Sequence, residues 1–125
     1  MIELDANFLV AALRSEERAT RMTQRAIARN DEIAMSPIAW SEFLCGPLIA
    51  GEHEQARLIV THILPFTIED GELAAHLFNA SGRRSRSHAD CMIAAHAIRR
   101  GAELATLNAV DFRRFEKFKL RLVAP

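Results

Sequence analysis

The sequence predicts an α/β fold, namely a three-layer α/β/α sandwich around a mostly parallel central sheet of about five strands. One observation behind this class is that short apolar runs, typical of buried strands, alternate along the chain with longer segments of helical spacing. Another is that the 125 residues are 50% hydrophobic and contain no repeat or linker, which is typical of one domain with one core. We therefore predict a single domain over residues 1–125.

In the predicted order, one or two helices separate each strand from the next. Apolar runs bounded by turn residues predict the strands at residues 1–5, 32–35, 65–68, 103–107 and 120–123. Apolar residues at helical spacing predict the helices at residues 7–28, 37–45, 52–63, 70–79, 89–98 and 110–115. Because a helix separates each strand from the next, the strands are expected to pair in parallel.

Local signals support the first elements in order. The first helical segment is expected to restart near Ser15, because Glu16 and Glu17 suit the first turn of a new helix. After the second strand, Ser36 and Pro37 have the form of an N-cap residue followed by proline at the first helical position.

Signals in the second half are equally local. Gly46 and Gly51 break the helix that Pro37 begins, and helical spacing then resumes. Asp70 is expected to cap the next helix, and a polar, basic loop at residues 81–87 precedes the most apolar helix, which Gly101 ends.

Four acidic residues occupy positions that a parallel sheet would bring together. They are Asp5, Glu42, Asp90 and Asp111, and they lie where strands give way to helices or on the apolar side of a helix. Such positions gather at one edge of the sheet. Clustered carboxylates repel one another unless a hard cation such as Mg²⁺ or Mn²⁺ neutralises them, and such a cation suits the hydrolysis of phosphate esters. The sequence therefore predicts a metal-dependent phosphodiesterase or phosphomonoesterase site.

Three of these acids also have a purely structural interpretation. Asp5 could be a turn residue after a strand, and Asp90 and Asp111 could complete capping boxes begun at Ser87 and Asn108. The capping and metal-binding interpretations are compatible with each other.

Glu42 is harder to explain in that way. Ile38 and Cys45 place it on the apolar face of its helix, where a glutamate is costly without a partner.

Four segments resemble, in order, the signatures of PIN-domain nucleases, and the likeness is greatest to the VapC toxins of type II toxin-antitoxin pairs. They are residues 4–7, 36–46, 89–95 and 105–112. The resemblance spans nearly the whole chain and implies a Mg²⁺- or Mn²⁺-dependent endoribonuclease.

In that family the positions matched by the four acids form the metal site. The resemblance also implies that Asn7, Thr106 and Asn108 are polar supporting residues. Leu107 departs from the pattern, because the family often has arginine there, which puts a phosphate contact in doubt.

The resemblance further implies a cognate antitoxin and a toxin homodimer. The antitoxin is expected to block the acidic site with an arginine and to lie along an apolar groove. The residues that we expect to supply this groove are Phe8, Leu9, Leu13, Trp40 and Leu44.

Charge and composition restrict where nucleic acid could bind. Sixteen basic residues balance sixteen acidic ones, so contacts with RNA must rest on local patches. Arg83, Arg84 and Arg86 lie just ahead of Asp90, and we expect them either to hold RNA phosphates or to form a solvated loop.

No apolar stretch approaches the ~20 residues of a membrane span, and the first residues lack the form of a secretory signal, so a cytoplasmic protein is expected.

Other functions fit the sequence less well. A haloacid-dehalogenase-type phosphatase would need a second aspartate at the position of Asn7. A phosphorylated receiver module would need an adjacent acidic pair near the N-terminus and a late lysine, and neither is visible. A PIN-like fold retained only for RNA or protein binding is disfavoured because all four acids are present. We predict an endoribonuclease that is the toxin of a toxin-antitoxin pair.

Overall fold

The computed structural model describes residues 1–84 and 87–124. Within these residues, five strands form one sheet in the order β3-β2-β1-β4-β5, and every neighbouring pair is parallel. The strands are β1 (Ile2–Leu4), β2 (Ile33–Met35), β3 (His62–Ile63), β4 (Glu103–Ala105) and β5 (Arg121–Leu122). The predicted fold class is confirmed.

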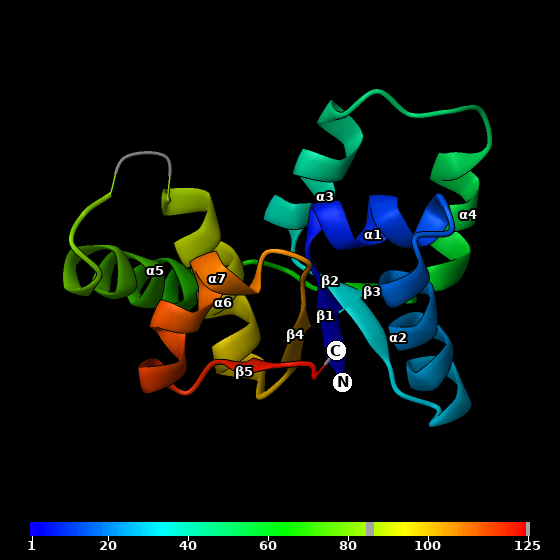
Figure 1. Cartoon of the computed structure of the whole chain (residues 1–125). Helices are drawn as coiled ribbons and strands as arrows, with labels where there is room; N and C mark the ends of the chain where they lie inside the picture. Colours follow the sequence, from blue (N-terminus) through cyan, green and yellow to red (C-terminus); the bar gives the residue numbers. More distant parts are fainter. Residues whose placement is uncertain (85–86, 125) are drawn as a thin grey trace.

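Helices cover both sides of this sheet. They are α1 (Ala6–Leu13), α2 (Glu17–Ala28), α3 (Pro37–Cys45), α4 (Glu52–Ile59), α5 (Ile68–Ala80), α6 (His88–Arg100) and α7 (Ala109–Phe112), with the 3-10 helix η1 (Arg113–Phe118) after α7. In Figure 1, α1, α2 and α4 lie on one side of the strands, and α5 and α6 lie on the other. Among the described helices, none is long and apolar enough to cross a membrane.

The central strand β1 packs differently on its two faces. Ile2 and Leu4 pack on the side of Met22 in α2, whereas Glu3 is bonded to His96 in α6. Successive residues of a strand point to opposite faces of the sheet. Asp5, two residues after Glu3, is therefore directed toward the α6 side at the carboxyl end of the strand.

Three of the predicted local signals are present. Ser15 lies between α1 and α2 with a left-handed φ of 61°. The Ser36 hydroxyl accepts a hydrogen bond from the backbone N–H of Ala39 at 3.1 Å and caps α3. Gly101 ends α6 with a φ of 63°, a conformation that glycine adopts without strain.

The predicted helix over residues 52–63 is too long. Helix α4 ends at Ile59, and residues His62–Ile63 form β3 instead. The backbone N–H and the hydroxyl of Thr61 both donate to the carbonyl of Ile33, at 2.9 and 3.0 Å. Pairing with β2 therefore overrides the helical spacing of this segment.

The predicted strand over residues 65–68 is also wrong. Ile68 already belongs to α5, and its cap is Thr67 instead of Asp70. Asp70 is the reciprocal partner in a capping box, in which its carboxylate accepts from the backbone N–H of Thr67 at 2.8 Å. The apolar run at residues 65–68 therefore leads into a helix, and Ile68 is exposed to solvent.

Candidate functional site

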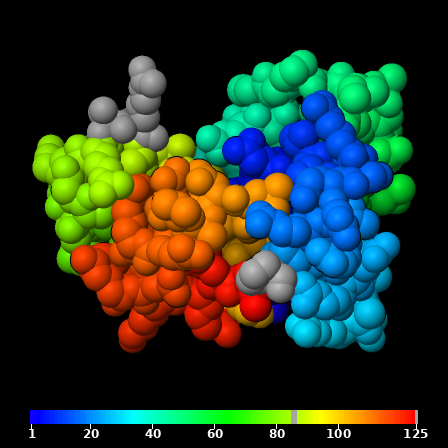
Figure 2. All heavy atoms as spheres, viewed as in Figure 1, coloured from blue at the N-terminus to red at the C-terminus, as the bar shows by residue number. Residues whose placement is uncertain are grey.

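A cleft opens where β1, β4 and the first turns of the surrounding helices meet. It has a volume of about 90 Å³. Its lining residues are Asp5, Ala6, Asn7, Glu42, Asp90, Ile93, Asn108 and Phe112. Figure 2 shows the surface hollowed between the part formed by α5 to α7 and the part formed by α1, α3 and α4. Three of the four predicted acids thus face one space.

Asp5 is the most firmly held of these acids. It caps α1, because one carboxylate oxygen accepts from the backbone N–H of Phe8 at 2.9 Å. The other oxygen accepts from the hydroxyl of Thr106 at 2.5 Å. Burial raises the pKa of Asp5, and these two hydrogen bonds act in the opposite direction. Asp5 therefore has both roles, helix cap and cleft residue.

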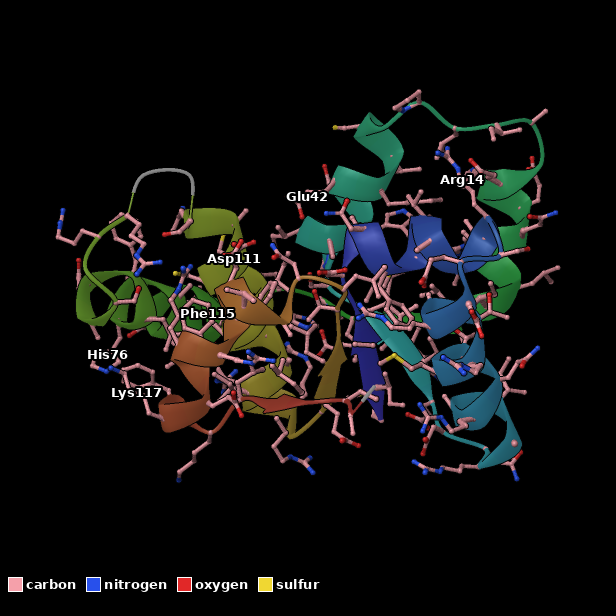
Figure 3. The ribbon with its side chains drawn as sticks, viewed as in Figure 1. Arg14, Glu42, His76, Asp111, Phe115 and Lys117 are labelled. Atoms are coloured by element: carbon pink, nitrogen blue, oxygen red, sulfur yellow. The ribbon has the colours of Figure 1, made fainter. Side chains whose placement is uncertain are left out.

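Glu42 reaches the cleft from α3, on the opposite side from α7, as the labelled side chains in Figure 3 indicate. The residue is exposed, so the prediction that it occupies a buried apolar face is wrong. Its carboxylate nevertheless faces the cleft, where desolvation and then the charges of Asp90 and Asp5 raise its pKa.

Asp90 lies in the first turn of α6 and is half-buried. The capping box predicted with Ser87 does not form, because the Ser87 hydroxyl donates to the carbonyl of Arg84 at 2.7 Å and makes no cap bond. Burial raises the pKa of Asp90, the charge of Arg114 opposes that rise, and the charges of Asp111 and Asp5 reinforce it. Asp90 is left available to the cleft.

Asp111 lies beside the cleft, on α7, and is exposed. Its carboxylate accepts from the side-chain amide of Asn108 at 2.7 Å. Asn108 is the N-cap residue of α7 but makes no side-chain cap bond, so the second predicted capping box is also absent. Asp111 acts on the cleft through its charge on Asp90.

Thr106 joins the two sides of the site. Its hydroxyl donates to Asp5 and accepts from the backbone N–H of Asn108 at 2.9 Å. The end of β4 therefore fixes both Asp5 and the turn that leads to Asp111. Asn7, the third of the predicted supporting residues, lines the cleft directly.

The donor set suits a hard divalent cation, because the polar side chains that line the cleft offer only carboxylate and amide groups. In the described part of the chain, however, no three His, Cys, Asp or Glu side chains stand close enough together to hold a metal ion as they are placed. The neighbouring carboxylates raise the pKa of Glu42 and of Asp90, so the residues fit a metal in kind and in charge. Holding one would require them to draw inward.

The predicted basic loop is described only in part. Arg86 lies outside the described residues. Arg84 is exposed. Arg83 donates to the side-chain oxygen of Asn79 at 2.5 Å and lies 5.6 Å from the centre of the Phe78 ring. Both described arginines are at the surface near the start of α6.

The predicted apolar groove needs correction. Phe8 and Leu9 are 1% and 0% exposed, so they belong to the core and cannot contact a partner. Leu44 is 44% exposed, and Leu13 and Trp40 are half-buried, so these three remain available.

Arg114 is a neighbour of the site that the sequence did not distinguish from the basic residues around it. Its charge acts on Asp90, and its guanidinium lies 4.5 Å from the centre of the Phe115 ring. The only available signal was its position three residues after Asp111, which many surface residues share.

The chain matches a known protein family, and its fold is similar to several solved structures. A family model described as "PIN domain" matches residues 2–117. The FitAcB structure from Neisseria gonorrhoeae is similar with a TM-score of 0.76 and 22% identity over 100% of this chain and 98% of that chain. VapBC2 from Rickettsia felis, bound to a DNA fragment from its promoter, is similar with a TM-score of 0.72 and 25% identity over 98% of each chain.

A toxin-antitoxin complex from Klebsiella pneumoniae is similar with a TM-score of 0.70 and 23% identity over 90% of each chain. No curated protein matches the chain significantly.

Proposed function

Because the chain belongs to the PIN domain family, we propose that it is a Mg²⁺- or Mn²⁺-dependent endoribonuclease. The observation that carries the proposal is the cleft in which Asp5, Glu42 and Asp90 come together at one edge of the sheet, with Asp111 beside it. Their mutual repulsion is the electrostatic property that a divalent cation relieves.

Each acid contributes from a different element. Asp5 would be the fixed ligand, because the backbone of α1 and the hydroxyl of Thr106 hold both of its oxygens. Glu42 and Asp90 would close on the ion from α3 and α6, and Asp111 would complete the set with Asn108 orienting it. When bound, the cation would polarise the phosphoryl oxygens and lower the pKa of a water molecule.

The substrate that we propose is an RNA phosphodiester. In-line attack of water on the phosphorus of an RNA phosphodiester, with departure of the 3′ oxygen, leaves a 5′-phosphate and a 3′-hydroxyl. An acidic cleft repels the rest of the polyanion, so positive groups nearby must contribute to binding. Arg83, Arg84 and Arg86 are the residues that we propose for this role.

The biological role that we propose is that of the toxin in a toxin-antitoxin pair. The similar fold of a chain in a toxin-antitoxin complex supports this proposal. It includes a cognate antitoxin that plugs the acidic cleft with an arginine, a homodimer of this chain and a cytoplasmic location. The exposed Leu44 and half-buried Trp40, which flank Glu42 on α3, are the apolar residues that such a partner could cover.

The proposal is tested by incubating the purified chain with end-labelled RNA in Mg²⁺, in Mn²⁺ and in EDTA. We expect cleavage only with metal, 5′-phosphate ends on the products and loss of about a thousandfold in rate for Asp90→Asn, which corresponds to ~4 kcal/mol of transition-state stabilisation. Binding of RNA without cleavage in either metal would instead support a non-catalytic RNA-binding module.

A further inference from the structure

A buried hydrogen bond joins β1 to α6 just below the acidic cleft. The Nδ1 atom of His96 lies 2.6 Å from Oε1 of Glu3, and the two side chains are 0% and 1% exposed. Glu3 lies in β1 and Asp5 directly follows that strand with an extended backbone, so both side chains project from the same face of the sheet. On α6, Ile93 lines the cleft with Asp90, and His96 follows Ile93 by three residues on the same side of the helix.

The strand and the helix therefore meet at two levels. Asp5 and Asp90 face each other across the upper level, in the cleft, and Glu3 and His96 are bonded at the lower level. We call the bonded pair the Glu3–His96 bridge. Any rotation or sliding of α6 against β1 would have to stretch the bridge.

The bridge has no route to a substrate. The other ring nitrogen of His96, Nε2, lies 3.0 Å from the carbonyl oxygen of Leu64 and 3.3 Å from that of Pro65. Carbonyl oxygens only accept, so Nε2 carries a proton and donates it. Both ring nitrogens are occupied inside the core, which excludes His96 as a group that touches RNA.

Stability does not explain the bridge. The second carboxylate oxygen of Glu3, Oε2, is buried and has no hydrogen-bond partner among the described residues. A buried polar atom without a partner costs free energy, and buried ion pairs can often be replaced by apolar side chains of similar volume without loss of stability.

We propose that Glu3 and His96 are positioning residues, whose bridge sets the depth and rotation of α6 against β1 and thereby the separation of the Asp5 and Asp90 carboxylates. This inference rests on the proposed function, because the separation matters only if both acids hold one cation. Groups that orient metal ligands from behind typically change metal affinity or activity by about 10–100-fold when they are removed.

The test measures Mn²⁺ affinity by electron paramagnetic resonance of the free ion and the melting temperature of the metal-free protein. In Glu3→Leu with His96→Leu, the apolar pair fills the space without a bridge. We expect the variant to fold, with a melting temperature lowered only by the loss of the His96 Nε2 hydrogen bonds to the carbonyls of Leu64 and Pro65, and a dissociation constant for Mn²⁺ that rises by about tenfold or more. Glu3→Leu alone should weaken Mn²⁺ in the same direction.

A conservative variant separates the bridge from the charge. In Glu3→Gln the amide can donate to Nδ1 of His96 while Nε2 still donates to Leu64, so the bridge is kept in neutral form. Mn²⁺ affinity should stay within about twofold of the wild type. A loss as large as that of the leucine variants would overturn the proposal, because the charge of Glu3 and not the bridge would then matter.

Asp70→Asn is the matched control. Asp70 is also buried and is also bonded to α6, through Arg99 and Arg100 at its far end. The Asp70→Asn substitution should lower the melting temperature and leave Mn²⁺ affinity unchanged. Equal Mn²⁺ affinity in the wild type and a folded leucine variant would overturn the positioning role of the Glu3–His96 bridge and leave the proposed function untouched. Absence of Mn²⁺ binding by the wild type would instead count against the proposed function.

Discussion

Asp5 illustrates how one residue can satisfy two interpretations that the sequence leaves open. Its backbone position makes it the N-cap of α1, and its second oxygen remains in the cleft under the hydroxyl of Thr106. Asp90 and Asp111 are different, because neither completes the capping box that its spacing suggests. Helix capping therefore does not explain why acids occupy these two positions. Their location in or beside the cleft is the better explanation.

The raised pKa of Asp90 has a consequence for the metal-free protein. A carboxyl group whose pKa is higher in the folded than in the unfolded state stabilises the fold below its unfolded pKa, and that contribution is lost as the pH rises. Asp90→Asn should therefore raise the melting temperature at pH 7, and the gain should shrink as the pH falls toward about 4, the ordinary range of an aspartate, and be absent below it. Thermal melts in EDTA from pH 3.5 to 7.5 measure this difference. An equal loss of stability at every pH would mean that Asp90 has a structural role.

Part of this site was predictable from single residues and part was not. The position of Asp5 follows from the rule that carboxyl ends of parallel strands share an edge. Asp90 reaches the same edge because it lies at the start of α6, the helix whose other end leads into β4. Glu42 was predicted from its place on the apolar face of its helix, but the residue is exposed. It contributes to the cleft because its carboxylate faces that space. The Glu3–His96 bridge has no local signal, since 93 residues separate its partners.

At the scale of elements, the start of α5 is held by an unusually complete set of contacts. Asp70 accepts hydrogen bonds from the backbone of Thr67 and from Arg99 and Arg100 of α6. Although burial by itself would raise the pKa of Asp70, these bonds hold it well below its usual range. The sequence indicated a helix start here but placed its cap at Asp70, three residues after the observed cap Thr67, because the apolar run through Ile68 has the form of a strand.

Removing that carboxylate should be costly. Asp70→Asn leaves Arg100 partly buried beside a neutral side chain, and we expect the free energy of unfolding to fall by about 3 kcal/mol at pH 7. Since the pKa of Asp70 is depressed, its contribution is present above the unfolded value and is lost as the pH falls, so the difference should diminish in acid. Urea unfolding at pH 7 and pH 3 checks both statements, with Glu72→Gln, an exposed residue of the same helix, as the control. A variant as stable as the control would contradict this account of α5.

The loop before α6 allows a separate prediction about RNA. If Arg83 and Arg84 neutralise phosphates, replacing both with glutamine should weaken binding to every single-stranded sequence. The slope of log affinity against log salt should flatten by about 0.7 for each lost contact. Binding is best measured in the Asp90→Asn background, where cleavage is absent.

The control for the loop is Arg18→Gln with Arg25→Gln, two exposed arginines of α2. The α2 pair should leave the slope unchanged. Equal effects from the loop pair and the α2 pair would mean that RNA responds to total charge and not to the loop.

At the scale of the whole molecule, the alternation of strands and helices was enough to predict the α/β class and the parallel sheet. The errors lie at edges, where β3 forms by pairing with β2 and not by its own pattern. The edge strand β3 has only two residues, too few side chains to be recognised along the chain, and its tertiary partner decides its position. The other edge strand, β5, is equally short but lies within the strand predicted at residues 120–123.

Binding of the proposed antitoxin involves the surface of the whole molecule. If the neighbouring reading frame encodes the proposed antitoxin, co-expression with its product should yield a complex that elutes larger than the chain alone and does not cleave RNA. Leu44→Glu on α3 should weaken that complex without changing the cleavage rate of the free chain, because Leu44 is exposed outside the cleft. Leu58→Glu, an exposed apolar residue of α4, is the control. A chain that expresses without toxicity and binds no neighbouring gene product would contradict the toxin role.

We propose that four acids from separate elements hold one kind of divalent cation. The most direct measurement is a Mn²⁺ titration, followed by electron paramagnetic resonance and by melting temperature, of the wild type and of Asp5→Asn, Glu42→Gln, Asp90→Asn and Asp111→Asn. The wild type should gain about 2.7 kcal/mol of stability when free Mn²⁺ is 100 times its dissociation constant, and each variant should need more Mn²⁺ for the same gain. A wild type that is indifferent to millimolar Mn²⁺, or four variants that bind Mn²⁺ as the wild type does, would contradict the claim.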